Sequence, residues 1–311
     1  MKISVIIPAH NEAACIEACL QAMQQGLGET QLQVLVICNG CSDQTANLAR
    51  RLATNSTHDI QVHELEEASK SAALNRGDSA ALHFPRFYVD ADVVVSGAAL
   101  GALAQRLQPG QYMACSPRLE LNLEHSNAMV RAFYRTWMQL PYVTQNLIGC
   151  GVYGLSAAGR SRFGEFPNLI ADDCFVRLQF TGDEKHSVAE QHFSVRAPRT
   201  LSSLIRINSR RLEGQRQLRK HFRQTTQREG QQQKRVLLSR LANPLGWPDL
   251  LIYLWVRLAS MTALRLRLMR GERETWSRDE SSRAIVAERT KLPPGGEGHQ
   301  EAQAMERSIE S

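Results

Sequence analysis

Two carboxylates follow an apolar, β-branched run in Phe87-Tyr88-Val89-Asp90-Ala91-Asp92-Val93-Val94-Val95. Such a run predicts a buried strand, and in an open α/β sheet ligands bind beyond the carboxyl ends of the strands. Carboxylate oxygens and substrate phosphates are the ligands that Mg²⁺ prefers. Asp90 and Asp92 therefore predict a metal site that holds a nucleoside diphosphate. The alternative is a pair of solvated turn acids, because aspartate is common in turns.

Strand-like and helix-like segments alternate before this stretch. Short apolar runs at 3–7, 32–38 and 60–65 predict three further strands, and helical patterns separate them. Such alternation predicts an α/β fold with a mostly parallel central sheet and flanking helices. Four loops then face the same edge of the sheet, and they are His10-Asn11-Glu12, Asn39-Gly40, Ser69-Lys70 and Asp90-Ala91-Asp92.

Length and composition limit the choice of class. The chain has 311 residues, 43% of them hydrophobic, which is enough for a large core. No apolar run is long enough to predict a transmembrane helix, and no signal peptide is visible. Seven cysteines without a disulfide pattern suit a reducing compartment. The pair Cys38-Asn39-Gly40-Cys41 leaves open a redox or half-zinc site, although no second pair completes a zinc set.

Four ordered motifs carry a family resemblance. They are Val5-Ile6-Ile7-Pro8-Ala9-His10-Asn11-Glu12, Asn39-Gly40-Cys41-Ser42-Asp43-Gln44-Thr45, Lys70-Ser71-Ala72-Ala73-Leu74-Asn75-Arg76-Gly77 and Val89-Asp90-Ala91-Asp92. In order and spacing these motifs resemble family 2 glycosyltransferases of the GT-A fold, over residues 1 to about 180. The resemblance implies a nucleotide-sugar donor, a divalent metal (Mn or Mg) and a hydroxyl acceptor, which can be a cell-envelope glycan or a lipid-linked group.

The resemblance also implies donor-side roles. Asn39 stands where the family has a base-binding acid, so the identity of the base stays open. Each residue has a structural alternative: a loop histidine, a first-turn acid of a helix or an ordinary surface lysine. The implied donor-binding residues are Pro8, His10, Glu12, Asn39, Asp43, Lys70 and Asp90, with Asp92 as the main metal ligand and Asp90 beside it.

A second set of positions matches the family's acceptor side. Gly151 lies in the glycine-rich segment 149–156, where small residues permit close approach of an acceptor. In Ala171-Asp172-Asp173, Asp173 matches the family's catalytic base and Asp172 replaces its glutamate. The chemistry asks for a base that takes the proton of the attacking hydroxyl. Both acids also suit a helix N-terminus, and Asp172 is expected as the cap.

Basic residues dominate 206–240, where only Glu213 and Glu229 are acidic. In the family an arginine of this region braces the donor pyrophosphate, which points to Arg210 and Arg211. The alternative is a solvated basic helix. Leu212 follows Arg211 where processive members carry an aromatic residue, so a non-processive enzyme is expected.

The segment after Pro248 mixes leucine, tryptophan, tyrosine and arginine. This mixture suits a helix in a membrane interface, and equally a helix packed on its own domain or in an oligomer contact. An anionic membrane surface is therefore an expected partner. Nucleic acid is not, because only 6% of the residues are aromatic and the basic segment holds just one of them, Phe222.

The sequence thus predicts a GT-A-like domain at 1–200, with a nucleotide-sugar half to about 95 and an acceptor half after it. A basic, amphipathic helical extension at 201–275 and a charged, disordered tail at 276–311 follow. The expected function is metal-dependent, inverting, non-processive sugar transfer, in the cytoplasm or at the inner face of the cell membrane. The alternatives are a non-catalytic membrane-associated scaffold of the same fold and a sugar-nucleotide nucleotidyltransferase, although Pro8-Ala9-His10-Asn11-Glu12 stands where the latter's Gly-rich loop would be.

Overall fold

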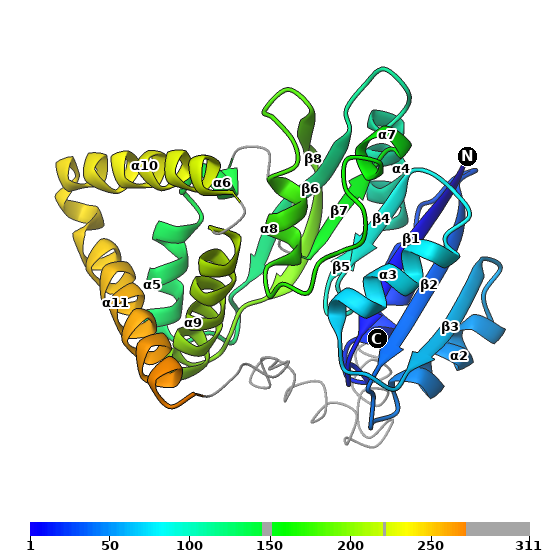
Figure 1. The fold of residues 1–311 in the computed structure, drawn as a ribbon, viewed down its shortest axis with the longest axis horizontal. Coiled ribbons are helices and arrows are strands. Elements are labelled where there is room, and N and C mark those ends of the chain that lie inside the picture. Colours follow the sequence, from blue (N-terminus) through cyan, green and yellow to red (C-terminus); the bar gives the residue numbers. More distant parts are fainter. Residues whose placement is uncertain (145–150, 220–221, 272–311) are drawn as a thin grey trace, which may run out of the picture.

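The computed structural model describes residues 1–144, 151–219 and 222–271 (Figure 1). Its first half alternates strands and helices as the sequence predicts. The elements of this half are β1 (Lys2–Ala9), α1 (Ile16–Met23), β2 (Gln31–Asn39), α2 (Thr45–Thr54), β3 (Asp59–Leu65), α3 (Lys70–Ala80), β4 (Arg86–Val89), β5 (Val94–Val95) and α4 (Gly97–Arg106).

The second half adds the other strands of the sheet and then becomes helical. Its elements are β6 (Ala114–Asn122), α5 (Ala128–Trp137), α6 (Pro141–Thr144), β7 (Val152–Leu155), α7 (Ala157–Arg160), α8 (Asp172–Arg177), β8 (Lys185–Arg196), α9 (Leu201–Leu218), α10 (Arg223–Ser239), the short 3₁₀ helices η1 (Arg240–Ala242) and η2 (Pro244–Gly246), and α11 (Trp247–Met269).

One sheet runs through both halves, in the order β3-β2-β1-β4-β7-β6-β8-β5. The strands β3, β2, β1 and β4 are parallel, as are β6 and β8, whereas β7 is antiparallel to both of its neighbours. The carboxyl ends of β1, β2 and β4 therefore lie at one edge. The predicted α/β class with a largely parallel sheet and flanking helices is confirmed.

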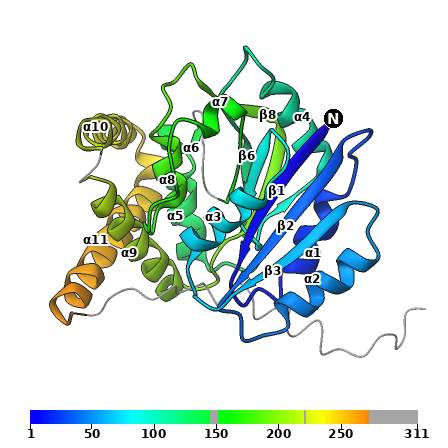
Figure 2. The ribbon, with the colours of Figure 1, turned by 45° about the vertical axis from the view of Figure 1, so that its right-hand side comes forward.

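The two faces of the sheet hold separate hydrophobic cores. Ile3, Val5 and Ile7 pack on one face with α1, α2 and α4, whereas Ile6 packs on the other with Leu74 of α3. This division follows from the strand period of two, which turns successive side chains to opposite faces. Figure 2 shows α3 on the opposite side of β1 and β2 from α1 and α2.

A helical group stands beside the sheet, where α9, α10 and α11 lie with α5 and α6 (Figure 1). Tyr253 of α11 stacks on Phe133 of α5, with ring centroids 5.1 Å apart. Both guanidinium contacts of Arg135 with the carboxylate of Asp249 measure 2.6 Å. These contacts join α11 to α5.

The hydropathy of the helices bears on whether any of them could span a membrane. Among the described residues, no helix is long and apolar enough to cross one. The predicted helical segment at 201–275 contains α9, α10 and α11. The predicted disordered tail, 276–311, lies outside the described residues.

Candidate active site

Two loops at the edge formed by β1, β2 and β4 are bonded to each other. Oδ1 of Asn11 accepts hydrogen bonds from the backbone N–H groups of Ser42 (2.7 Å) and Asp43 (3.2 Å). Asn11 adopts a left-handed backbone conformation with φ 54°, which asparagine tolerates better than most residues. The loop after β1 therefore has a fixed shape against the loop after β2.

The side chain of Asp43 accepts hydrogen bonds from both of these loops. Its Oδ2 accepts from the N–H of Ala13 at 3.1 Å, and its Oδ1 accepts from the N–H of Thr45 at 3.0 Å. The hydroxyl of Thr45 in turn accepts from the N–H of Glu12 at 2.7 Å. Asp43 thus holds Thr45, the first residue of α2, and also the residues that lead into α1.

Asn39 and His10 meet at the ends of β2 and β1. The buried side-chain amide of Asn39 donates to the carbonyl of Ala9 at 2.9 Å. Nδ1 of His10 lies 2.6 Å from the carbonyl oxygen of Asn39. Pro8 is buried in β1 opposite Ile37 of β2. The Asn39 side chain therefore points into the strand ends, and only the half-buried His10 among these residues reaches solvent.

Lys70 joins acids from two parts of the chain. It follows Ser69, whose hydroxyl caps α3 by accepting from the N–H of Ala72 at 3.2 Å. The ammonium lies 2.8 Å from Oδ1 of Asp90 and 3.2 Å from Oδ2 of Asp172. Burial alone would lower the pKa of Lys70, but the surrounding carboxylates, led by that of Asp172, raise it above its ordinary value. Lys70 is therefore fully charged.

Asp90 and Asp92 lie directly after the end of β4. The N–H of Asp90 donates to the carbonyl of Gly151 at 2.7 Å, and Asp92 is exposed two residues later. Gly151 has φ +107°, and a Cβ there would lie 2.6 Å from Cγ2 of Val93. Burial raises the pKa of the Cys19 thiol, and the charges of Asp92, Asp90 and Glu12 raise it further, so these acids act on the same part of α1.

Asp172 and Asp173 begin α8. Asp172 is only 5% exposed, and burial raises its pKa to about 6 although Lys70 opposes the shift. Oδ1 of Asp173 accepts from the N–H of Cys174 at 2.7 Å, so this acid stabilises the first turn. The N-cap position of α8 is Ala171, and no side chain caps this helix, so the cap role predicted for Asp172 is wrong; Asp172 turns inward to Lys70 instead.

Arg210 and Arg211 lie on α9, and the guanidinium of Arg211 sits 4.7 Å from the ring centroid of Trp137. The same helix reaches α8 through Gly214, where a Cβ would lie 2.8 Å from the Cβ of Ala171. This close approach brings α9 against the residue that precedes the acid pair.

Tyr153 is a site residue that sequence reasoning missed. It lies on β7, stacks on Tyr88 with centroids 5.0 Å apart, and is 3% exposed. Its hydroxyl has no hydrogen-bond partner in the described part of the chain. Burial raises the pKa of Tyr153, as do Asp172 and Asp173. The signal lay in the short apolar segment Val152-Tyr153-Gly154-Leu155, which forms the fully buried strand β7.

Whether these residues can hold a metal ion depends on how many ligands the protein itself must supply. Across 1–144, 151–219 and 222–271, no three histidine, cysteine, aspartate or glutamate side chains are grouped to hold a metal. Mg²⁺ with a phosphate substrate needs only one or two carboxylates, because phosphates and water complete its shell. Asp90 and Asp92 fit that donor set. Cys38 and Cys41 are free thiols and belong to no such group.

Comparison with known families agrees with this geometry. The family described as "Glycosyl transferase family 2" matches residues 4–160, half of the chain. The chain belongs to glycosyltransferase family 2. The matched region includes β1, β2, α3 and β4, whose ends carry the candidate donor residues.

Curated family 2 relatives are similar over shorter segments. Glycosyltransferase AglD of Haloferax volcanii is 29% identical over 120 residues, 37% of this chain and 19% of that protein. Glycosyltransferase AglE of the same organism is 38% identical over 76 residues, 24% of this chain and 25% of that protein. The match thus spans a quarter or less of each relative's length.

A solved structure shows the same fold over most of the chain. It is the mannosyltransferase PcManGT from Pyrobaculum calidifontis in complex with GDP-Man and Mn²⁺. The two share 17% identity with a TM-score of 0.55, over 93% of this chain and 79% of that chain. This likeness identifies the GT-A fold. The family match makes the chain a glycosyltransferase enzyme.

Proposed function

We propose that this glycosyltransferase moves a sugar from a nucleoside diphosphate donor to a hydroxyl acceptor, with inversion and with the help of a divalent cation. The observation that supports this most is the cluster in which Lys70 contacts both Asp90 and Asp172. Asp90 ends β4, where open α/β sheets bind ligands, and Asp172 starts α8. A donor at the strand ends would therefore lie beside the acids of α8.

On the donor side, we assign the diphosphate to Lys70 and the cation to Asp92 with Asp90. An ammonium acts as a point charge toward phosphate. A cation held by these carboxylates would offset the charge that grows on the leaving diphosphate. The structure with GDP-Man and Mn²⁺ belongs to a protein of the same fold, which supports a divalent metal here. Pro8, His10, Glu12, Asn39 and Asp43 are proposed to shape the nucleotide site.

On the acceptor side, we assign the base to Asp173. In an inverting displacement the acceptor hydroxyl attacks the anomeric carbon from the face opposite the leaving group, and a carboxylate takes its proton. Asp172 keeps Lys70 in place through their 3.2 Å contact. Gly151, close to Asp90, is proposed to lie on the acceptor side of the site. Arg210 is proposed to brace the diphosphate, because the guanidinium of Arg211 stacks on Trp137.

The transfer is proposed to add one sugar at a time. Leu212 follows Arg211, so no aromatic platform stands there for a growing polymer. Product analysis by mass spectrometry, with an acceptor once it is known, would give a single added hexose. A ladder of products would contradict this part of the proposal.

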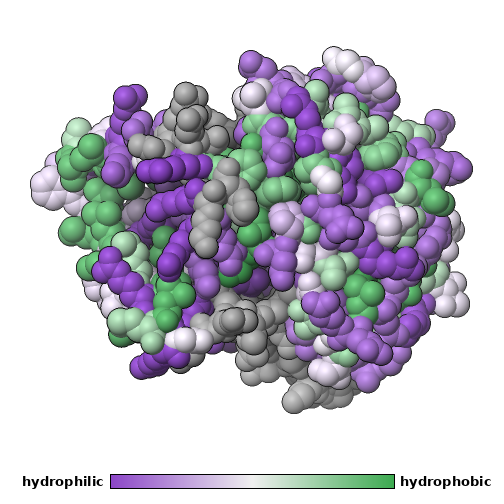
Figure 3. All heavy atoms as spheres, in the orientation of Figure 1, coloured by the Kyte–Doolittle hydropathy of each residue, from purple (hydrophilic) through white to green (hydrophobic). Residues whose placement is uncertain are grey.

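The helical group is proposed to touch a membrane surface. Large apolar side chains are exposed along α11 at Leu251, Leu254, Trp255 and Leu258, with exposed fractions of 46% to 64%. Figure 3 shows hydrophobic residues gathered at the end of the molecule formed by α10 and α11. Arginine, tryptophan and leucine on one helix are typical of interfacial anchoring. Flotation with neutral and anionic vesicles tests this, and failure to bind either contradicts it.

A donor-binding panel tests the proposed function. The melting temperature is measured with UDP-, GDP-, dTDP- and CDP-sugars, each with and without Mn²⁺. We expect one nucleotide to stabilise the chain only with metal, because binding to the folded state raises stability. Asp92→Ala should abolish that shift. The matched control is Asp183→Ala, an exposed acid in the turn before β8. A shift that survives in Asp92→Ala would remove Asp92 from the metal site.

A further inference from the structure

Two cysteines meet where β2 ends, and the thiol of Cys38 is hydrogen-bonded to the sulfur of Cys41. Cys38 is buried in β2, where it lies opposite Ala9 of β1. Gly40 has φ +57°, so the chain turns there and brings Cys41 back over the strand ends. The thiol of Cys41 donates to the carbonyl of Ala9 at 3.4 Å. The fold therefore brings two free thiols together at the end of the β1–β2 pair.

Cys41 has the surroundings of a reactive thiol. It is half-buried, and Ser42 and Asp43 after it are exposed, so this side of the loop is open to solvent. The hydrogen bond from Cys38 lowers the pKa of Cys41, and the N–H of Asn11, 3.3 Å from the sulfur, acts in the same direction against burial. The same pairing, together with burial, raises the pKa of Cys38. Cys41 is therefore the nucleophile of the pair, and Cys38 is the partner that keeps its proton.

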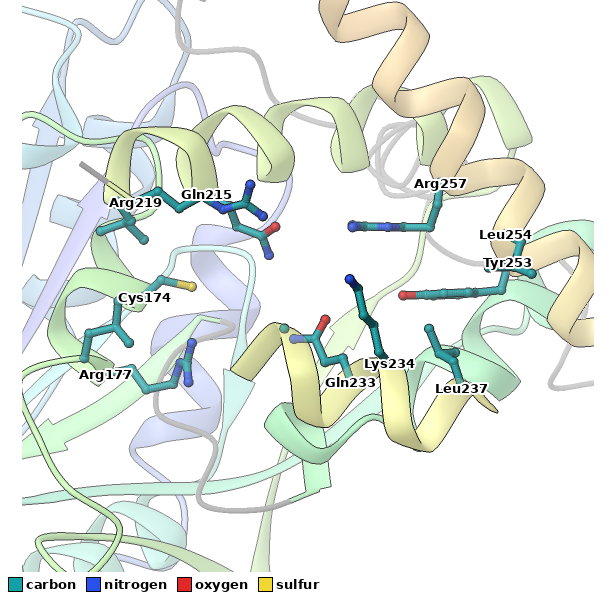
Figure 4. A pocket seen from close by; sticks show the side chains of 13 residues that line it. Cys174, Arg177, Gln215, Arg219, Gln233, Lys234, Leu237, Tyr253, Leu254 and Arg257 are labelled. Carbon is teal, nitrogen blue, oxygen red and sulfur yellow. The ribbon is translucent and has the colours of Figure 1, made fainter. Parts of the chain in front are cut away.

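Three other described cysteines differ from this pair. Burial raises the pKa of Cys19, and it raises that of Cys115 to about 12, so both stay protonated. Cys174 of α8 is half-buried and lines a cavity of about 250 Å³ among the four helices α8, α9, α10 and α11 (Figure 4). The described lining of this four-helix cavity contains no second cysteine. These three thiols are therefore internal references for the reactivity of the pair.

The sulfur of Cys41 also joins two loops that are proposed to shape the nucleotide site. It accepts from the N–H of Asn11 after β1, while Oδ1 of Asn11 accepts from the N–H groups of Ser42 and Asp43 after β2. A disulfide holds its two sulfurs about 2 Å apart, so it would draw the Cys41 sulfur toward Cys38 and away from Asn11. The oxidation state of the pair would therefore change how the two loops fit together.

We propose that Cys38 and Cys41 are an oxidation site at which a hydroperoxide produces an intramolecular disulfide, and that this disulfide weakens donor binding. The Cys41 thiol breaks the O–O bond and becomes a sulfenic acid, while the hydroperoxide is reduced to an alcohol, or to water if it is hydrogen peroxide. The Cys38 thiol then attacks that sulfur, and the hydroxyl group leaves with the thiol proton as water. A dithiol reverses the change by exchange. The effect on the donor rests on the proposed function, whereas the oxidation site does not.

The oxidation site is tested on the full chain, which is reduced, freed of reductant, treated with hydrogen peroxide and then alkylated in denaturant. Cleavage after glutamate and arginine releases residues 30–50, whose only cysteines are Cys38 and Cys41. We expect this peptide to lose two hydrogen atoms and to escape alkylation, and dithiothreitol to restore both thiols. The reference thiols should still be alkylated, and they are Cys19, Cys115 and Cys174.

Two variants assign the roles within the pair. In Cys38→Ser, peroxide should leave a sulfenic acid on Cys41 that dimedone traps, because the thiol that would displace water is gone. In Cys41→Ser, Cys38 should stay reduced. Cys174→Ser is the matched control and should form the disulfide as the wild type does. The oxidation site is overturned if the wild-type peptide keeps both thiols, or if Cys174 is oxidised faster than the pair.

Donor binding is measured on the reduced and the oxidised chain after removal of peroxide, with UDP-, GDP-, dTDP- and CDP-sugars and Mn²⁺. The oxidised wild type should bind its donor about tenfold more weakly, the size expected when one hydrogen bond that fixes the loops is lost. Peroxide should leave the donor affinity of Cys41→Ser unchanged. Equal binding by both forms of the wild type would overturn the effect on the donor. If no donor stabilises even the reduced chain, the proposed function is contradicted, and the peptide mass still decides the oxidation site.

Discussion

The ammonium of Lys70 lies 3.2 Å from Oδ2 of Asp172, and this ion pair connects the start of α3 with the start of α8. The Asp172 side chain is 7% exposed and that of Lys70 is 21% exposed. When one partner of an enclosed ion pair is removed, the other keeps a charge that water solvates poorly. The pair is therefore sensitive to substitution on either side.

Lys70→Met should lower the free energy of unfolding by about 2–3 kcal/mol, somewhat less than for a fully buried pair because solvent reaches Lys70. It should also abolish the donor-induced shift in melting temperature, because the diphosphate loses its cation. Urea unfolding and the donor panel measure both effects. Lys70→Arg, which keeps the charge, is the control. Wild-type stability with full donor binding in Lys70→Met would contradict both roles.

Asp173→Asn should reduce the rate of transfer by about 10²–10⁴-fold, the range typical of a lost general base. Donor binding should stay at the wild-type level, because Asp173 is assigned to the acceptor hydroxyl and not to the donor. Single-turnover transfer and the thermal shift give the two readouts. Asp172→Asn serves as the comparison, since it alters the Lys70 contact and keeps the base. Normal transfer by Asp173→Asn would place the base on another residue.

Asp78 of α3 accepts three hydrogen bonds, from Arg160 Nε (2.9 Å), Arg86 (2.8 Å) and the hydroxyl of Tyr88 (2.6 Å). Burial raises the pKa of Asp78, but these donors, Arg160 first, outweigh burial and hold it below its ordinary value of 3.8. A carboxylate with a lowered pKa in the folded state contributes stability above the unfolded pKa. That contribution is lost as the pH falls through the folded pKa.

Asp78→Asn should therefore cost about 3 kcal/mol of unfolding free energy at pH 7 and remove part of the stability loss below pH 4. Urea unfolding between pH 7 and pH 3 measures the two curves, which should converge in acid. Asp183→Asn, at an exposed position, should run parallel to the wild type. Parallel curves for Asp78→Asn and the wild type would show that Asp78 does not supply this acid sensitivity.

Gly151→Ala should destabilise the chain by about 2–3 kcal/mol, because it combines a left-handed φ of +107° with a Cβ that would meet Val93. Gly110→Ala is a matched control, since Gly110 has φ +83° and nothing within 4 Å of the added Cβ. Its cost should be about 1 kcal/mol, from the backbone alone. Thermal or urea unfolding compares them. Equal costs would mean that the Val93 contact relaxes freely.

The meeting of Lys70 and Asp90 could be predicted from the sequence, because alternating strands and helices bring their loops to one edge of a parallel sheet. The direction of the Asn39 amide could not. Its bond to Ala9 depends on the register of β2 against β1, in which Ala9 lies opposite Cys38. A motif match identifies which residue occupies a position in the sequence. It does not determine the rotamer of that residue's side chain.

The pairing of Lys70 with Asp172 and the four-helix cavity depend on contacts between distant segments. The basic character of 206–240 was visible in the sequence, but Arg177 lies outside that segment and joins it only when α8 packs beside α9. Helical periodicity predicts which face of a helix is apolar, and it does not specify which other helix that face will meet.

The antiparallel pairing of β4 with β7 means that the nucleotide-sugar half and the acceptor half share one continuous sheet. Asp78 reinforces this join, since it bonds to Arg86 on one side and to Arg160 of α7 on the other. The division predicted near residue 95 therefore falls within one continuous sheet. A fragment ending there would expose the edge of β4 to solvent and to other chains, with aggregation as the consequence.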